Sequence, residues 1–195
     1  MNNRTGLSLI FLVLGVVAVV APANDDSPIR LGEVLPEVQL AGDTVGALAI
    51  VDGRIHYEPW STRDLTGKPR IVYHLAARPG IDKIHAALFA ALSDLQIDPD
   101  TFVTLTLLNG DDVSFGVTGI ARSEFEKNKR KYPAGEFVFD GDSSAQRRWQ
   151  LARKSSAVIL VDDRGRVLFF KDGPLSDEET RGLIEQVKQV SGYQR

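Results

Sequence analysis

The 195-residue sequence contains no cysteine, three histidines and one methionine. A chain without cysteine has no disulfide, no thiolate metal site and no thiol nucleophile, which excludes thiol–disulfide oxidoreductase and thiol peroxidase activity. Three histidines supply few ligands for zinc, and the phosphate-binding motifs of nucleotide sites are absent, so we expect no metal and no cofactor. The residues that are present, 43% hydrophobic and 25% charged, are typical of a single globular domain.

The first 23 residues have the pattern of a secretory signal peptide. Arg4 supplies a positive charge, residues 7–20 are uncharged and strongly apolar, and Ala21-Pro22-Ala23 provides small residues for cleavage before Asn24. The alternative is a retained membrane anchor, but a bilayer span needs roughly 17–25 apolar residues. We therefore expect residues 1–23 to be cleaved on export, with no transmembrane anchor left behind.

Charge is unevenly distributed along the chain. Cleavage would remove only Arg4 and move the formal net charge from −3 to −4, which disfavours a nucleic-acid partner. Residues 119–155 nevertheless hold nine Lys or Arg and five Asp or Glu. This basic stretch is either a solvated helix face with loop charges or a contact surface for an acidic partner or anionic lipid. Its basic residues include Lys127, Lys129, Arg130, Lys131, Arg147, Arg148, Arg153 and Lys154.

Strand and helix patterns alternate along the remaining sequence. Residues 70–76 are apolar without alternation, as expected for a central strand buried on both faces. Asp52-Gly53 predicts a hairpin turn, and Asp163-Arg164-Gly165 predicts another. The alternation predicts an α/β fold, a mixed sheet flanked by helices with an N-terminal β extension. Strands are expected at 38–40, 48–52, 70–76, 101–108, 136–139, 157–161 and 167–170, and helices at 79–95, 119–131, 142–151 and after the capping box Ser176–Glu179.

Two segments resemble parts of the thioredoxin fold. Leu65-Thr66-Gly67-Lys68-Pro69 resembles the segment that enters the strand before the redox motif of thiol–disulfide oxidoreductases and peroxiredoxins. Residues 157–167 resemble the strand, turn and strand that follow the cis-proline of those proteins. The order of elements is also similar. The resemblance implies an extension at 24–63 and a thioredoxin-like domain at 64–195, so that 24–195 form one structural unit.

Six further motifs resemble the YtfJ family of bacterial periplasmic proteins. This resemblance implies a thioredoxin-like fold and a location in the periplasm of a Gram-negative bacterium, but no activity, since the family is functionally uncharacterised. The motifs are His74-Leu75-Ala76-Ala77-Arg78, Asn109-Gly110-Asp111-Asp112, Tyr132-Pro133, Trp149-Gln150-Leu151, Ser155-Ser156-Ala157-Val158 and Lys171-Asp172-Gly173-Pro174-Leu175.

The position of the redox cysteines is occupied by other residues. Counting without gaps from Gly67-Lys68 places the two cysteines at Pro79 and Asp82, or, one residue earlier, at Arg78 and Ile81. The segment Arg78-Pro79-Gly80-Ile81-Asp82 is then either a well-capped helix start with proline at its first position or a place that holds an anion or a peptide carboxylate beside Arg78.

The cis-proline position falls on Ser156, counting back from Asp162. A cis bond before a residue other than proline costs roughly 2.5–4 kcal/mol, so we expect a trans bond. Ser155 and Ser156 either present the loop to a peptide or are ordinary serines at a strand edge. Earlier in the chain, Asn109, Asp111 and Asp112 follow the end of the strand expected at 101–108, where α/β folds often carry functional loops.

The sequence predicts a non-redox binding or interaction module rather than an enzyme. A peptide, a protein or a small anion would lie in the groove between Arg78, Pro79, Gly80 and Asp82 on one side and Ser155 and Ser156 on the other, with no catalytic residue. The alternative is a cysteine-free enzyme that uses His74, Arg78 and Asp82 for acid–base chemistry. His74, however, lies in a strand expected to be buried, where a lone histidine is more often a hydrogen-bonded core residue.

Overall fold

The computed structural model describes residues 27–111 and 118–193, so the predicted signal peptide and Asp112 lie outside the described residues. No helix in the described ranges is both long and apolar enough to cross a membrane. The elements follow one another as β1 Gln39–Leu40, β2 Gly46–Val51, β3 Arg54–Glu58, β4 Trp60–Ser61, η1 Thr62–Asp64, β5 Arg70–Ala76, η2 Ile81–His85, α1 Ala86–Leu95, β6 Val103–Asn109, α2 Thr118–Lys131, β7 Glu136–Asp140, α3 Ser144–Trp149, β8 Ser156–Val161, β9 Val167–Asp172 and α4 Asp177–Val190.

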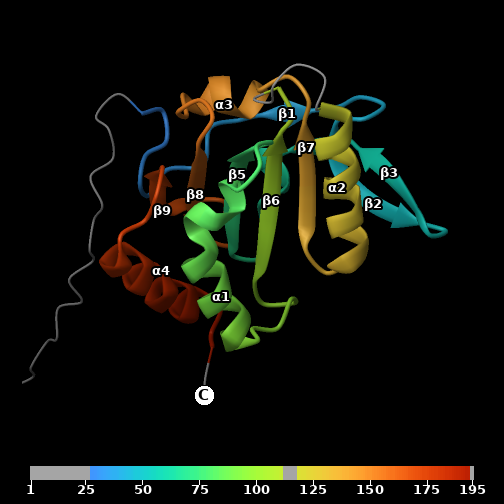
Figure 1. Cartoon of the computed structure of the whole chain (residues 1–195). Coiled ribbons are helices and arrows are strands. Elements are labelled where there is room, and N and C mark those ends of the chain that lie inside the picture. Colours follow the sequence, from blue (N-terminus) through green and yellow to red (C-terminus); the bar gives the residue numbers. More distant parts are fainter. Residues whose placement is uncertain (1–26, 112–117, 194–195) are drawn as a thin grey trace, which may run out of the picture.

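One mixed sheet organises the fold, with the strand order β3-β2-β7-β6-β5-β8-β9 (Figure 1). β5, β6 and β7 are parallel neighbours, whereas β8 runs antiparallel to β5 and β9 antiparallel to β8. β2 and β3 form a hairpin that joins the sheet beside β7, and β1 pairs separately with β4. The predicted mixed sheet, with parallel crossovers and a closing hairpin, is confirmed.

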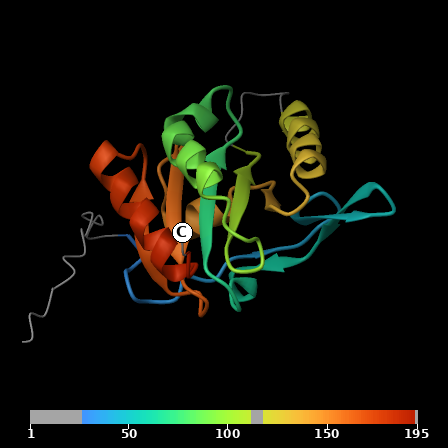
Figure 2. The same cartoon turned by 90° about the horizontal axis from the view of Figure 1, so that it is seen from below.

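Both faces of the central strands of the sheet are buried, each by a different set of elements. α1, α2 and α4 cover one face, and α3 with the N-terminal segment 29–40 covers the other (Figure 2). All seven residues of β5 are buried, with Ile71 and Tyr73 on the first face and Val72 on the second. The prediction of a central strand buried on both faces is confirmed. The N-terminal segment and the sheet share one of the two apolar clusters.

The two predicted hairpin turns are present, each for a local reason. Asp52 and Gly53 both have positive φ, 50° and 74°, as the two-residue turn between β2 and β3 requires. In the turn between β8 and β9, the Asp162 carboxylate accepts hydrogen bonds from the Arg164 and Arg166 amides at 2.9 and 2.8 Å. The predicted capping box of α4 is also confirmed, since the Ser176 hydroxyl and the Glu179 carboxylate each accept from the other residue's amide.

The helix after β5 starts later than predicted. Gly80 is left-handed with φ 78°, so the chain cannot continue helically from Pro79, and Pro79 is not the first residue of a helix. A 3₁₀ turn, η2, intervenes before α1 begins at Ala86, and Gly80 provides no side-chain cap. The well-capped helix start expected at Pro79 is therefore wrong.

Gly46 connects the hairpin to the sheet and tolerates no side chain. It has φ 120°, and a Cβ at this position would lie 2.1 Å from the Glu58 carbonyl oxygen. We expect Gly46→Ala to lower the free energy of unfolding by about 2 kcal/mol through backbone strain and overpacking. Gly182→Ala is the matched control, because a Cβ there meets nothing within 4 Å inside α4. It should stabilise the protein by about 0.5–1 kcal/mol in urea denaturation, and equal effects of the two substitutions would contradict the prediction.

Candidate functional site

Several of the predicted site residues meet at one edge of the sheet. Because β5, β6 and β7 are parallel, their carboxyl ends lie at the same edge, where ligands of α/β proteins commonly bind. The segments that follow these strands begin at Ala77, Gly110 and Gly141. β8 is antiparallel, so the loop 150–155 that precedes it reaches the same edge. This carboxyl edge therefore combines four segments that are distant in sequence.

The structure brings Arg78 next to the loop that precedes β8. The Arg78 guanidinium donates a hydrogen bond to the Lys154 carbonyl at 3.3 Å, and the Ala76 amide donates to the Ser155 carbonyl at 3.0 Å. Arg78, with Pro79, Gly80 and Asp82, is exposed. Ser155 is half-buried and Ser156 is only 1% exposed. Peptide bonds among the described residues are all trans, as expected for the bond before Ser156.

A buried polar cluster that the sequence did not reveal lies beneath η2. The His85 Nε2 donates to the Gly173 carbonyl at 3.0 Å, because a carbonyl oxygen can only accept, and Nδ1 then accepts from the Ser156 hydroxyl at 3.3 Å. The Tyr73 ring packs edge-on against the imidazole, with centroids 5.5 Å apart. Burial lowers the pKa of His85 and, with the Asp82 carboxylate, raises that of Tyr73 to about 12. The cluster ties η2 to β8 and to the loop before α4.

His74 lies on the opposite face of the sheet from this cluster. Its side chain is 1% exposed, and its ring packs against Trp149 of α3 at a centroid distance of 6.3 Å. Arg78 and Asp82 are exposed beyond the end of β5, and Asp82 belongs to η2 on the first face. The structure therefore does not bring His74, Arg78 and Asp82 together in one solvent-reached pocket, which the acid–base alternative requires.

A second polar network links the ends of β6 and β7. Asn109 and Asp140 are neighbours in register, and both are fully buried. The Asn109 side-chain oxygen accepts from the Asp111 amide at 3.1 Å and from the Ser143 hydroxyl at 2.9 Å. The same hydroxyl lies 3.4 Å from the Asp111 carboxylate. The side-chain nitrogen of Asn109, Nδ2, has no hydrogen-bond partner within the described ranges, so this end of the sheet retains a buried donor.

Asp140 holds the beginning of α3. Its carboxylate accepts from the Ser144 amide at 3.0 Å and from the Ala145 amide at 2.8 Å. Burial raises the pKa of Asp140 to about 6 in spite of these hydrogen bonds. The Asp140 carboxylate thus does what the side chain of an N-cap residue usually does. The N-cap residue itself, Ser143, has a left-handed backbone with φ 61° and makes no side-chain capping hydrogen bond.

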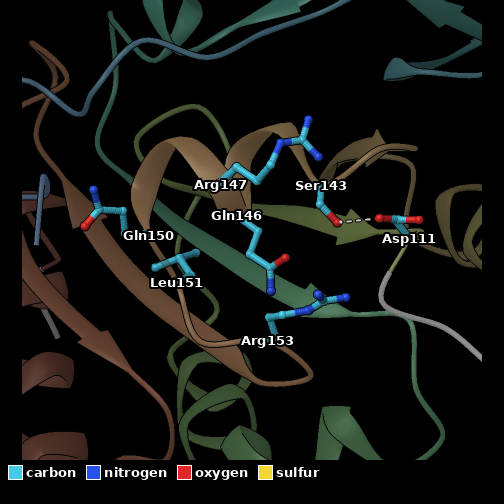
Figure 3. Close-up of a pocket in the computed structure, with 7 residues that line it drawn as sticks. All are labelled: Asp111, Ser143, Gln146, Arg147, Gln150, Leu151 and Arg153. Carbon is cyan, nitrogen blue, oxygen red and sulfur yellow. Dashed lines mark hydrogen bonds between the residues drawn. The ribbon is translucent and has the colours of Figure 1, made fainter.

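A cavity of about 280 Å³ opens between α3, the end of β6 and the loop 150–155 (Figure 3). Figure 3 shows the Gln146 amide and the Arg153 guanidinium on the same side of α3, with the hydrogen-bonded pair Ser143 and Asp111 at one end. The charged residues of the lining are Arg147, Arg153 and Asp111, and Arg147 also forms an ion pair with the Asp142 carboxylate at 3.3 Å. The full lining is Asp111, Ser143, Gln146, Arg147, Gln150, Leu151 and Arg153.

Sequence reasoning found only one residue of this lining, Asp111. Arg147 and Arg153 belong to the basic stretch 119–155, but nothing in the sequence separated them from its other charges. The structure divides that stretch between the two faces of the sheet, since α2 packs on the first face and α3 on the second. It therefore does not form one continuous patch. Within the described ranges, no group of three His, Asp or Glu side chains comes close enough together to hold a metal.

Comparison with solved structures identifies the fold. A protein from Bacteroides thetaiotaomicron, provisionally assigned as a protein disulfide isomerase, matches with a TM-score of 0.56 and 14% identity over 85% of this chain and 92% of that one. The thioredoxin domain of a thiol-disulfide oxidoreductase from Bacteroides vulgatus matches with a TM-score of 0.52 and 14% identity over 82% and 98%. The chain has a thioredoxin-like fold, as predicted, and it carries no cysteine for thiol chemistry.

The family is established by closer sequence relatives. Residues 29–190 match the model of a family described as a bacterial protein of unknown function, YtfJ_HI0045. The uncharacterized protein YtfJ of Escherichia coli (strain K12) is 33% identical over 145 residues, which are 74% of this chain and 79% of that protein. The chain therefore belongs to the YtfJ family, as the sequence motifs predicted.

Proposed function

We propose that this protein is a non-redox binding module of the periplasm that holds the carboxylate of a peptide or of a small organic acid at the carboxyl edge of its sheet. The observation that carries the proposal is the cavity beside α3, whose lining includes the Arg153 guanidinium, one carboxylate, that of Asp111, and Arg147, which also forms an ion pair with Asp142 at 3.3 Å. Guanidinium groups bind carboxylates through paired hydrogen bonds, which gives both affinity and orientation. The periplasmic location rests on the signal pattern of residues 1–23.

The size and surroundings of the cavity favour the end of a chain over a large cofactor. Its volume of about 280 Å³ lies just below the range of ligand pockets, which span roughly 300–1,000 Å³. The carbonyl of Ser155 and the hydroxyl of Ser156 are already engaged within the protein. Ligand recognition is therefore assigned to the cavity, with the exposed Arg78 at the neighbouring rim, where it contacts Lys154.

Replacement of a cavity arginine tests this proposal. The probe is a mixed pool of acetylated pentapeptides with free carboxyl termini, compared with the same pool carrying amidated termini. We expect the carboxylate pool to bind, and Arg153→Ala to weaken its binding at least roughly tenfold, because a hydrogen bond to a charged group is lost. Isothermal titration calorimetry of the mature protein measures the change.

Arg130→Ala is the matched control for this experiment. Arg130 is exposed on α2 and belongs to the same basic stretch, but it does not line the cavity. Its replacement should leave the affinity unchanged. Equal weakening by both substitutions would instead indicate non-specific attraction to the basic stretch, and equal binding of carboxylate and amide pools would contradict carboxylate recognition.

A further inference from the structure

The two outermost strands of the seven-stranded sheet, β9 and β3, differ in what covers them. At one edge, the N-terminal segment covers part of β9: the Gly32 amide donates to the Val167 carbonyl at 2.7 Å, and the Val167 amide donates to the Glu33 carbonyl at 2.8 Å. At the other edge, β3 pairs with β2 alone among the described strands. The β2–β3 hairpin projects beyond the body of the protein in both views (Figures 1 and 2). An open edge strand is a template for pairing with another strand.

The turn geometry determines which groups of β3 face outward. Val51 and Arg54 flank the two-residue turn and form a hydrogen-bonded pair, and hydrogen-bonded pairs alternate with non-hydrogen-bonded pairs along the hairpin. Arg54, His56 and Glu58 therefore direct their main-chain groups toward β2. Ile55 and Tyr57 direct theirs outward, and within the described ranges these groups make no hydrogen bond.

The sequence of β3 is complementary to itself when it is read in the opposite direction. In an antiparallel pair of two copies centred on His56, Ile55 lies opposite Tyr57 of the second copy, and Arg54 lies opposite Glu58. The outward main-chain groups of Ile55 and Tyr57 then meet one another, which supplies four inter-strand hydrogen bonds. Opposite charges directly across from one another stabilise such a pair.

The neighbouring registers lack this complementarity. Centring on Ile55 places Glu58 opposite Asp52 of the second copy, so that two carboxylates repel each other. Centring on Tyr57 places Ile55 opposite Pro59, which has no amide hydrogen to donate. A register shifted by one residue places the outward main-chain groups of one strand opposite residues whose main-chain groups point away, toward β2 of the second copy. The register centred on His56 alone satisfies both the main-chain groups and the charges.

The charges of β3 are available for such a contact. Arg54, His56 and Glu58 are all exposed, and in the described part of the chain none of them forms an ion pair or a side-chain hydrogen bond. The Ile55 and Tyr57 side chains lie on the other face, where Tyr57 donates to the Glu126 carboxylate at 2.9 Å. The strand is thus held by its apolar face and leaves its charged face and its outer edge free.

We propose that β3 is the interface of a two-fold symmetric homodimer, in which the β3 strands of two copies pair antiparallel about His56 and join the two sheets into one. The dimer requires Arg54 of each copy opposite Glu58 of the other. It is independent of the cavity beside α3, so a failure of peptide binding would leave it intact.

Two charge-reversal variants test the proposal together. Arg54→Glu places glutamate opposite glutamate in its own dimer, and Glu58→Arg places arginine opposite arginine, so each variant alone should dimerise at least roughly tenfold more weakly than the wild type. In an equimolar mixture, each variant meets its complement at both positions. We expect the mixture to recover the dimer, as measured by sedimentation equilibrium.

Recovery in the mixture also shows that both variants are folded. Arg164→Glu is the matched control, because it makes the same charge change in the turn between β8 and β9, far from β3, and should leave dimerisation unchanged. A wild type that remains monomeric up to about 1 mM, where even a Kd of 1 mM would be visible, overturns the proposal. A wild-type dimer that neither charge reversal weakens overturns it as well.

Discussion

Replacement of Trp149 by alanine is expected to lower the free energy of unfolding by about 3–5 kcal/mol, the range for large buried aromatic side chains. Trp149 is fully buried at the end of α3, and its indole N–H donates to the Pro36 carbonyl at 2.9 Å. The residue therefore connects α3, the sheet and the N-terminal segment. Its loss would leave a cavity among all three, and urea denaturation followed by circular dichroism measures the change.

Two comparisons isolate the origin of this effect. Trp149→Phe retains much of the apolar volume but leaves the Pro36 carbonyl without its donor, so the expected loss is smaller, about 1–3 kcal/mol. Lys127→Ala, at an exposed site on α2, should change stability by less than about 0.5 kcal/mol. A loss below about 1 kcal/mol for Trp149→Ala would show that α3 and the N-terminal segment do not pack in solution as described.

The second large effect is expected at His85. His85→Leu removes the donor to the Gly173 carbonyl and the acceptor for the Ser156 hydroxyl, leaving two buried polar groups without partners. Each unsatisfied buried group costs about 1–3 kcal/mol, so we expect a total loss of about 2–6 kcal/mol for the two groups. His85→Gln retains an amide that can donate to Gly173, and it should recover part of the loss in the same urea measurement.

His85 also predicts a pH dependence with a definite sign. Burial lowers the pKa of His85 in the folded protein, so the unfolded chain binds a proton more readily. Stability should therefore fall as the pH drops below about 6.5, the ordinary pKa of histidine, until the lower pKa of the folded state is passed. His85→Gln should lose less stability than the wild type between pH 7 and 5. Parallel curves for the two proteins would contradict the neutral, buried imidazole.

The sequence predicted the sheet well because burial and turn chemistry are local signals. The uninterrupted apolar run of β5, the Asp52-Gly53 turn and the Ser176–Glu179 capping box each appear where expected. The helix start at Pro79 was wrong because the left-handed Gly80 and the tertiary contacts of His85 decide it. No periodicity in the sequence reports either of these.

The candidate site was predicted less completely than the fold. The sequence predicted a groove between Arg78 and Ser155, and it assigned Asn109 and Asp111 to a functional loop at the end of a strand. It could not show that Ser156 is buried against His85, or that His74 faces Trp149 across the sheet. The cavity residues Gln146 and Arg153 were missed for the same reason, since only the fold of α3 and its following loop brings them together.

The most direct test of carboxylate binding at the carboxyl edge is a map of amide chemical-shift changes during titration of the mature, isotope-labelled protein with the carboxylate-terminated peptide pool. We predict that the largest changes fall on Asp111, Ser143, Gln146 and Arg153, with smaller changes at Arg78, and that the amidated pool leaves these signals in place. Changes confined to α2, or equal changes with the two pools, would contradict the account.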